Sequence, residues 1–301
     1  MSPSWGIVTT VKAPLGEIAR FAAHHIALGA ARIHLFLDAP TPGIHRLTHP
    51  ALRVLDGTQD AAEIHRRQMA NAARAYAATD VTWLAHIDAD EFILADMPVA
   101  DALAALPRDI AQARMMPAEL LAPVAPGTTS HFKLPPQAAG QPRAVLEELY
   151  PDYGLHLRNG LISHGEGKAF FRTGLADARP GIHALLLPGQ RRAPEQRLDR
   201  IRLGHAHAPS WDAFHRNLPT RRANGSYSAA RDGQLSLSEL FDAIVQTTGD
   251  SGFRDFFDTV CTATPAHLAA LASRGMLLSR DLRLDAKARK LFPQLVDEDW
   301  H

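Results

Sequence analysis

The sequence lacks paired cysteines, a long apolar run and an excess of charge of one sign. Cys261 is the single cysteine of 301 residues, so no disulfide forms within the chain, which fits a reducing compartment. The most apolar stretch, residues 18–37, is interrupted by arginines and histidines and is too polar for the roughly 20 apolar residues of a membrane span. The N-terminus shows no secretory signal pattern. We expect a cytoplasmic protein without a transmembrane segment, and peripheral membrane association stays open.

The charges of the chain balance. Lysine and arginine total 32, as do aspartate and glutamate, so the formal net charge is zero. Proteins that bind nucleic acid electrostatically carry a clear excess of lysine and arginine, so we expect no nucleic-acid partner. Hydrophobic residues make up 46% of the chain, which argues against disorder and supports a folded core.

The first hundred residues alternate between strand and helix patterns. Apolar residues 5–11 predict a buried strand, and the helical spacing that follows runs from Pro14 to a stop at Gly29. Further strands are predicted at 33–37, 52–55 and 81–87, and a helix at 61–78. This alternation predicts an α/β fold with a mainly parallel sheet flanked by helices.

The remainder of the chain is less regular. Six prolines within residues 116–143 predict a long loop, with room for a short hairpin. Short strands are expected at 168–172 and 200–204, and helical patterns follow at 238–247, 253–260, 265–274 and 285–291. We therefore predict an α/β domain over residues 1–215 and a helical C-terminal cap over residues 216–301.

Polar residues stand at the ends of three predicted strands, where parallel α/β sheets bind their ligands, so we expect them to converge on one edge of the sheet. Thr10 and Lys12 end the first strand, Asp38 follows the second, and Asp88 and Asp90 follow the fourth. Two aspartates separated by one residue offer the hard oxygen ligands that Mg²⁺ or Mn²⁺ prefers. The structural alternative is a polar strand-to-turn junction in which an aspartate caps the next segment.

The apolar strand followed by Ile-Asp-Ala-Asp-Glu-Phe, residues 87–92, resembles the family 2-like glycosyltransferases, which have the GT-A nucleotide-sugar fold. Weaker matches follow in the right order over roughly residues 5–216: Lys12, Asp38, Gln68, Asn71, Lys168, Arg172, His183, His205 and Phe214. The chain departs from the family pattern after Lys12, where an Asn-Glu pair is usual, and after Asp38, where a Ser-Asp-Asp-Gly turn is usual.

The resemblance implies a metal-dependent, hexosyl-transferring enzyme. It would move a sugar from a nucleotide-diphosphate donor to a hydroxyl of a glycan or another acceptor, in cell-surface or extracellular glycan synthesis. Mn²⁺ or Mg²⁺ would neutralise the charge that develops on the departing diphosphate. The implied metal ligands are Asp88, Asp90 and His205, and the implied donor-binding residues are Thr10, Lys12, Asp38, Gln68, Asp88, Lys168 and Arg172.

Structural alternatives stand beside these roles. Asp38 can simply cap a turn, Lys168 and Arg172 can form a solvated strand edge, and His205 can be a packed histidine. Of His24 and His25 in the first predicted helix, we expect one in the core and the other facing outward.

The sequence does not single out a catalytic base. Inverting transfer needs a carboxylate or a histidine to deprotonate the acceptor hydroxyl. Glu148 and Glu166 are our candidates, with Glu147 and Asp152 beside them. Two other functions stay open: a non-catalytic relative that binds sugar nucleotides or glycans, and a metal-dependent phosphohydrolase.

Overall fold

The computed structural model divides the chain into two compact units. It describes residues 2–58, 63–125, 127–157, 159–228 and 236–300. The first unit comprises Met1–Met116, Glu166–Leu203 and Arg283–His301, and the second comprises Pro117–Gly165 and Gly204–Leu282. This division differs from the predicted boundary between residues 215 and 216. Within the described ranges, no helix has both the length and the apolar character needed to cross a membrane.

The first unit is built on a mixed sheet with strand order β6-β9-β4-β1-β2-β3. Strands β1 to β4 pair in parallel, whereas β9 pairs antiparallel with both β4 and β6. The α/β class predicted from the sequence is confirmed. The strands are β1 (Trp5–Val11), β2 (Arg32–Leu37), β3 (Leu52–Asp56), β4 (Trp83–His86), β5 (Glu91–Ala95), β6 (Gln112–Leu120), β9 (Lys168–Arg172), β10 (Arg179–Pro180), β11 (Leu185–Leu187), β12 (Arg191–Arg192) and β13 (Glu195–His205).

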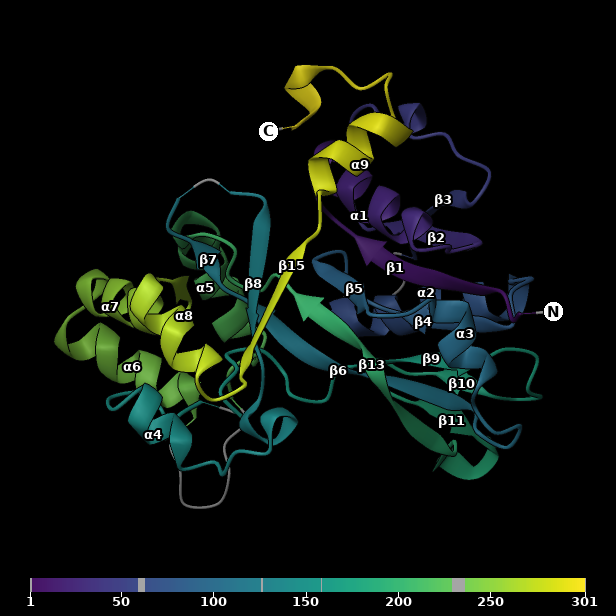
Figure 1. Cartoon of the computed structure of the whole chain (residues 1–301). Coiled ribbons are helices and arrows are strands. Elements are labelled where there is room, and N and C mark those ends of the chain that lie inside the picture. The colour runs from purple at the N-terminus through teal and green to yellow at the C-terminus, as the bar shows by residue number, and fades with distance from the viewer. Residues whose placement is uncertain (1, 59–62, 126, 158, 229–235, 301) are drawn as a thin grey trace. The chain divides into compact units, whose positions relative to one another are not determined.

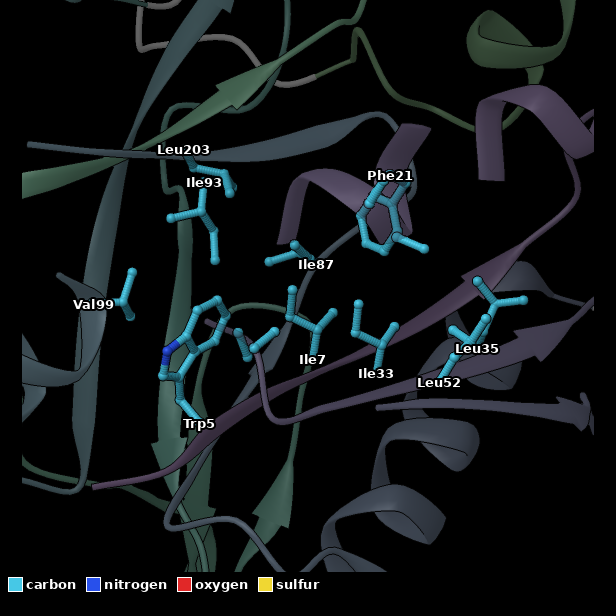
Figure 2. Packing of buried hydrophobic residues seen from close by; sticks show 14 of the residues in the cluster. Trp5, Ile7, Phe21, Ile33, Leu35, Leu52, Ile87, Ile93, Val99 and Leu203 are labelled. Atoms are coloured by element: carbon cyan, nitrogen blue, oxygen red, sulfur yellow. The ribbon is translucent and has the colours of Figure 1, made fainter. Parts of the chain in front are cut away.

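Helices of the first unit cover both faces of this sheet. They are α1 (Leu15–Ala27), α2 (Ile64–Ala78), α3 (Val99–Ala104) and α9 (Leu284–Leu291), with 3₁₀ turns η1 (Ile44–Arg46), η3 (Pro188–Gln190) and η4 (Asp297–Trp300). Because side chains alternate along a strand, Trp5 and Ile7 of β1 join one core cluster with α1, α3 and α9, while Val8 joins another with α2. Figure 2 shows the first cluster, in which Trp5, Ile7 and Ile33 lie near Ile87. Each such side chain contributes about 1.5–3 kcal/mol through burial.

Local signals explain the first helix. Pro14 precedes α1 as its N-cap, and Gly29 follows its end with φ of +96°, a backbone conformation that glycine adopts at low cost. His24 and His25 are both buried, so the expectation that one faces outward is wrong. Both contact the backbone of Ile93: His24 Nε2 donates to its carbonyl at 2.8 Å, and its N–H donates to His25 Nε2 at 3.2 Å.

Part of the predicted C-terminal cap belongs to the first unit. Helix α9 lies beside α1 (Figure 1), and Asp285 accepts a hydrogen bond from Arg20 at 2.6 Å. Ala288 and Phe292 are buried in the same cluster as Trp5. The amphipathic pattern at 285–291 therefore predicts a helix, but its packing partner comes from the opposite end of the chain.

The second unit combines strands and helices around its own core. Its strands are β7 (Ala122–Pro123), β8 (Thr129–Lys133), β14 (Thr262–Ala263) and β15 (Leu277–Asp281), together with the ends of β6 and β13. Its helices are α4 (Val145–Leu149), α5 (Trp211–Ala223), α6 (Leu237–Thr247), α7 (Asp250–Val260) and α8 (Pro265–Ala272), with the 3₁₀ turn η2 (Pro136–Ala139). Aromatic residues such as Phe214, Phe241 and Phe256 form the centre of this core.

The predicted loop over residues 116–143 is partly strand. Residues 119–120 of β6 pair antiparallel with residues 132–133 of β8, and β8 pairs with β15. The hairpin left open in the sequence is therefore present, but β15 itself was not predicted. Pro117 lies within β6 and Pro123 ends β7, so proline content alone was a poor guide to loop structure here.

Candidate functional site

Three predicted site residues lie at one edge of the sheet in the first unit. Thr10 is the penultimate residue of β1, Asp38 directly follows β2, and Asp88 comes two residues after β4. Since β1 pairs in parallel with both β2 and β4, the carboxyl ends of the three strands point the same way. The predicted convergence of the strand ends on one edge is therefore observed.

Asp88 is the centre of a charged cluster at this edge. Its Oδ2 lies 2.9 Å from Nζ of Lys168, and its Oδ1 accepts a hydrogen bond from Gln68 at 2.8 Å. Its backbone N–H donates to the Glu91 carboxylate at 2.8 Å, and that carboxylate lies 4.0 Å from Nζ of Lys168. The structure thus brings together three residues that the sequence analysis singled out, namely Gln68, Asp88 and Lys168.

Burial decides the state of this cluster. The side chain of Lys168 is 1% exposed and that of Glu91 is fully buried, whereas the side chain of Asp88 is 28% exposed. Burial by itself lowers the pKa of Lys168, but Asp88 and Glu91 outweigh it and raise the pKa above the ordinary value. Lys168 is therefore a buried cation at neutral pH, and its interpretation as part of a solvated strand edge is wrong.

Two histidines near Lys168 have lowered pKa values and are neutral at neutral pH. Burial lowers the pKa of His86, the last residue of β4, to about 4, and the charge of Lys168 acts in the same direction. His183 also has a pKa below the ordinary value, because it is partly buried and because the charge of Lys168 acts on it. Its Nδ1–H donates to the Gly167 carbonyl at 2.9 Å. The cluster thus concentrates positive charge on a single group, Lys168.

A second part of the edge is formed by α2. Arg67 donates two hydrogen bonds to Asp38, at 2.6 and 2.8 Å, in a bidentate geometry. Asn71 donates to Oγ1 of Thr10 at 3.0 Å and accepts from the Thr58 N–H at 3.0 Å. Sequence analysis missed Arg67, although it directly precedes Gln68 on the same helix. Asp38 is thus more than a simple turn cap, because it fixes a guanidinium at the edge.

The remaining predicted binding residues lie apart from this cluster or at its margin. Asp90 is half-buried in the turn between β4 and β5, and Lys12 is exposed just after β1. Arg172 pairs with Trp83 across β4 and β9, so it lies at the opposite end of β9 from Lys168. Its guanidinium covers the Trp83 ring at 4.3 Å and donates to the Ile110 carbonyl at 2.9 Å. This placement gives Arg172 a packing role.

The two candidate bases fall in different units. Glu166 is exposed in the first unit, two residues before Lys168. Glu148 lies on α4 of the second unit, where its side chain is 65% exposed and lies 3.2 Å from Arg274. Of these two candidates, only Glu166 is therefore close in sequence to a residue of the charged cluster, Lys168.

His205 is the last residue of β13 and belongs to the second unit, where it joins a group of histidines. Its ring centroid lies 5.6 Å from that of His164 and 5.1 Å from that of His207. His207 is buried, hydrogen-bonds the Tyr227 hydroxyl at 2.9 Å, and has a pKa well below its ordinary value because of burial and of Arg221. The predicted metal ligands Asp88, Asp90 and His205 come from both units, so that ligand set stays a prediction.

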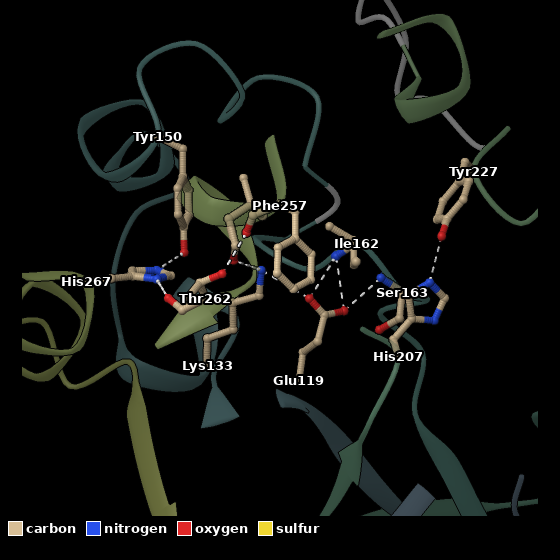
Figure 3. A network of polar contacts seen from close by, with 11 residues as sticks. Glu119, Lys133, Tyr150, Ile162, Ser163, His207, Tyr227, Phe257, Thr262 and His267 are labelled. Atoms are coloured by element: carbon tan, nitrogen blue, oxygen red, sulfur yellow. Dashed lines mark hydrogen bonds and ion pairs between the residues drawn. The ribbon is translucent and has the colours of Figure 1, made fainter. Parts of the chain in front are cut away.

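The second unit also contains a buried ion pair that sequence analysis missed. Glu119 and Lys133 lie 3.1 Å apart, and each side chain is 2% exposed. Glu119 accepts hydrogen bonds from the N–H groups of Ile162 and Ser163, and Lys133 donates to the Val260 carbonyl at 3.1 Å. Figure 3 shows this network. Burial opposes both charges, but the pair keeps the pKa of Lys133 raised and that of Glu119 lowered.

The chain was compared with known proteins. No protein-family model and no curated protein matches it. A solved galactosyltransferase LgtC, in complex with donor and acceptor sugar analogues, is 11% identical, with 98% of each chain covered and a TM-score of 0.33. Residues 1–349 of S. aureus TarS are 10% identical, covering 97% of this chain and 91% of that one, with a TM-score of 0.35. Likenesses at this level carry no argument about function.

Proposed function

We propose that this protein is a glycosyltransferase that uses a nucleotide-diphosphate sugar and a divalent ion. The observation that carries the proposal is the buried Lys168 held against Asp88 at the carboxyl end of β4, two residues before Asp90. This edge of a parallel sheet is where α/β proteins bind nucleotides. The resemblance of residues 87–92 to family 2-like glycosyltransferases supports the same proposal.

The electrostatics of the cluster suit a diphosphate leaving group. When the bond between the sugar and the phosphate breaks, negative charge builds up on the diphosphate. Lys168 is a cation fixed by burial and by two carboxylates, so it needs little reorganisation to face that charge. A donor that brings its own negative charge also compensates for any weakening of the Lys168–Asp88 pair.

The carboxylates of the turn fit a hard divalent ion only in part. Both oxygens of Asp88 have partners in Lys168 and Gln68, which argues that Asp88 acts on the ion through water or through these partners. Asp90 is half-buried in the turn and is our proposed direct ligand, with oxygens of the donor's phosphates completing its shell. Mn²⁺ or Mg²⁺ in this shell would neutralise the phosphate oxygens.

The rest of the edge is proposed to hold the nucleoside. Thr10, oriented by Asn71, and Asp38, oriented by Arg67, offer hydroxyl, carboxylate and guanidinium groups for the base and ribose. Lys12 is exposed at the same edge and can reach the donor without being fixed by packing. Arg172 is not included, because it lies at the other end of β9.

We propose Glu166 as the base. The acceptor oxygen forms a bond to the anomeric carbon, and the bond from that carbon to the phosphate oxygen breaks. The leaving nucleoside diphosphate keeps the electron pair, and the hydroxyl proton passes to the Glu166 carboxylate. Glu148 is the weaker candidate because its carboxylate already faces Arg274.

A second function, binding a sugar nucleotide without transfer, is favoured by one observation. Lys168 and Gln68 engage both oxygens of Asp88, so part of the predicted metal site is satisfied by the protein itself. A binding protein would keep the nucleotide affinity of the edge and show no turnover.

The two functions are separated by assaying turnover. The full chain is incubated with a panel of nucleotide-diphosphate sugars and Mn²⁺, and release of the nucleoside diphosphate is measured with and without glycan acceptors. We expect release that Asp90→Asn abolishes and Asp109→Asn, at an exposed aspartate of the same unit, leaves unchanged. Nucleotide binding without release would favour the binding protein, and activity on simple phosphate esters would favour a phosphohydrolase.

A further inference from the structure

We infer that His164 and His205 form a binding pair for a transition-metal ion within the second unit. Each ring offers a nitrogen, and the two nitrogens lie within 4.8 Å of each other. The ring planes are tilted by 42° with centroids 5.6 Å apart, so the rings are not stacked face to face. The inference goes beyond the proposed function, because it assigns a new ligand, His164, and a binding event that requires no sugar nucleotide.

The spacing of the two rings suits a shared ion. Two imidazole nitrogens bound to one Zn²⁺ at about 2.0–2.1 Å are at most about 4.2 Å apart. Small side-chain rotations therefore bring nitrogens that lie within 4.8 Å into a common shell. Imidazole favours Zn²⁺, Co²⁺, Ni²⁺ and Cu²⁺ over the hard ions that carboxylates prefer.

The backbone that carries His164 is held in place. The buried carboxylate of Glu119 accepts hydrogen bonds from the N–H of Ile162 at 3.1 Å and from the N–H of Ser163 at 2.8 Å, directly before His164. His205 is the last residue of β13, so the strand holds its backbone, and the residue is 7% exposed. A metal site needs ligands on such rigid supports, because loosely held ligands lose affinity.

The third histidine of the group supports the pair without joining it. His207 uses Nε2 for the hydrogen bond to Tyr227, and Arg221 donates to its backbone carbonyl at 2.7 Å. Its ring meets that of His205 edge to face at an interplanar angle of 86°. This contact orients His205. Two protein ligands leave open positions at the ion, which water or a substrate oxygen can fill.

Titration of the full-length protein with Co²⁺ alone tests the inference. Calorimetry gives the affinity, and visible absorption of the bound Co²⁺ reports nitrogen ligation. We expect His164→Ala and His205→Ala each to weaken binding at least tenfold and to change the spectrum. The matched control is His131→Ala, which removes a histidine of β8 that hydrogen-bonds Ser279.

Unchanged affinity in His164→Ala, or an equal loss in His131→Ala, would overturn the inference. If the alanine variants fold poorly, His164→Gln and His205→Gln keep the side-chain size and are judged by the same titration. A protein that binds Co²⁺ through His164 but turns over no sugar nucleotide would keep this inference and refute the proposed function. A protein that turns over a sugar nucleotide but does not bind Co²⁺ through His164 would support the proposed function and refute this inference.

Discussion

The two units each bury a lysine, but they surround it differently. Among the residues the structure describes, Lys133 and Lys168 are each 1% exposed. Lys133 faces Glu119, whose side chain is 2% exposed and which also accepts two backbone N–H groups. Lys168 faces Asp88, whose side chain is 28% exposed at the carboxyl end of β4.

The difference separates a structural ion pair from a candidate site. Both members of the Glu119–Lys133 pair are buried and have hydrogen-bond partners within the protein, so the pair offers no exposed group to a ligand. The Asp88–Lys168 pair is open to solvent on its carboxylate side and stands beside Asp90, so a phosphate or a metal ion can reach it. Exposure of the nearest carboxylate, rather than burial of the lysine, is what distinguishes the two.

The largest effect is expected from breaking the closed pair. Lys133→Met leaves the Glu119 carboxylate buried without its cation, which costs about 3–5 kcal/mol of the free energy of unfolding. Urea denaturation of the full chain measures this loss. The double variant Glu119→Gln, Lys133→Met removes both charges and should recover much of it. A single variant as stable as the wild type would show that the pair is not structural.

A smaller effect is expected from pH. His86 has a pKa of about 4 in the folded protein and about 6.5 when unfolded, so the unfolded chain takes up the proton first as the pH falls. Stability is therefore lost between about pH 6.5 and 4, by about 3 kcal/mol from this residue. Unfolding of His86→Gln over this range should show a shallower loss than the wild type.

His267 provides the comparison in the second unit. Its pKa is also about 4, first because of burial and then because of Lys133. Because the two histidines have the same folded pKa, His267→Gln should flatten the pH dependence by about as much as His86→Gln does. An equal pH dependence in the wild type and both variants would contradict the assignment of these neutral histidines.

Breaking the open pair should affect function more than stability. Lys168→Met removes the cation proposed to face the diphosphate, and we expect turnover to fall about a hundredfold, as for other groups that stabilise developing charge. Its destabilisation should be smaller than that of Lys133→Met, because Asp88 retains Gln68 and contact with solvent, and the more distant Glu91, 4.0 Å from Lys168, retains the hydrogen bond from the Asp88 N–H. Steady-state kinetics and urea denaturation of both variants test this contrast. A loss of stability as large as that of Lys133→Met, with turnover intact, would contradict it.

Local patterns in the sequence predicted much of the first unit. Strand β1 begins and ends as predicted, and α1 ends just before Gly29. The spacing of apolar residues and a glycine that ends a helix are both features of a few neighbouring residues, so the sequence shows them directly. The convergence of Thr10, Asp38 and Asp88 followed from the alternation of strands and helices. Asp90 lies near this edge because it follows Asp88 by two residues, and Lys12 lies near it because it directly follows β1. Their roles in binding stay predictions.

Contacts between distant segments could not be read from local patterns. Glu119 reaches Ser163, 44 residues away, and Arg114 pairs with Glu195, 81 residues away. The same limit explains why α9 was assigned to a C-terminal cap although it packs on α1. Arg67 was within reach, since it lies one residue before Gln68 on α2, but a bidentate partner for Asp38 becomes visible only when β2 and α2 are in place.

The central claim is tested most directly by the combined effect of Mn²⁺ and a nucleoside diphosphate on thermal stability. A ligand at about 100 times its dissociation constant stabilises the folded protein by about 2.7 kcal/mol. We predict that Mn²⁺ raises the unfolding temperature further when a nucleoside diphosphate is present, and that Asp90→Asn abolishes this increment while Asp109→Asn keeps it. An increment of the same size in Asp90→Asn, or none in the wild type with any nucleoside diphosphate, would contradict the account.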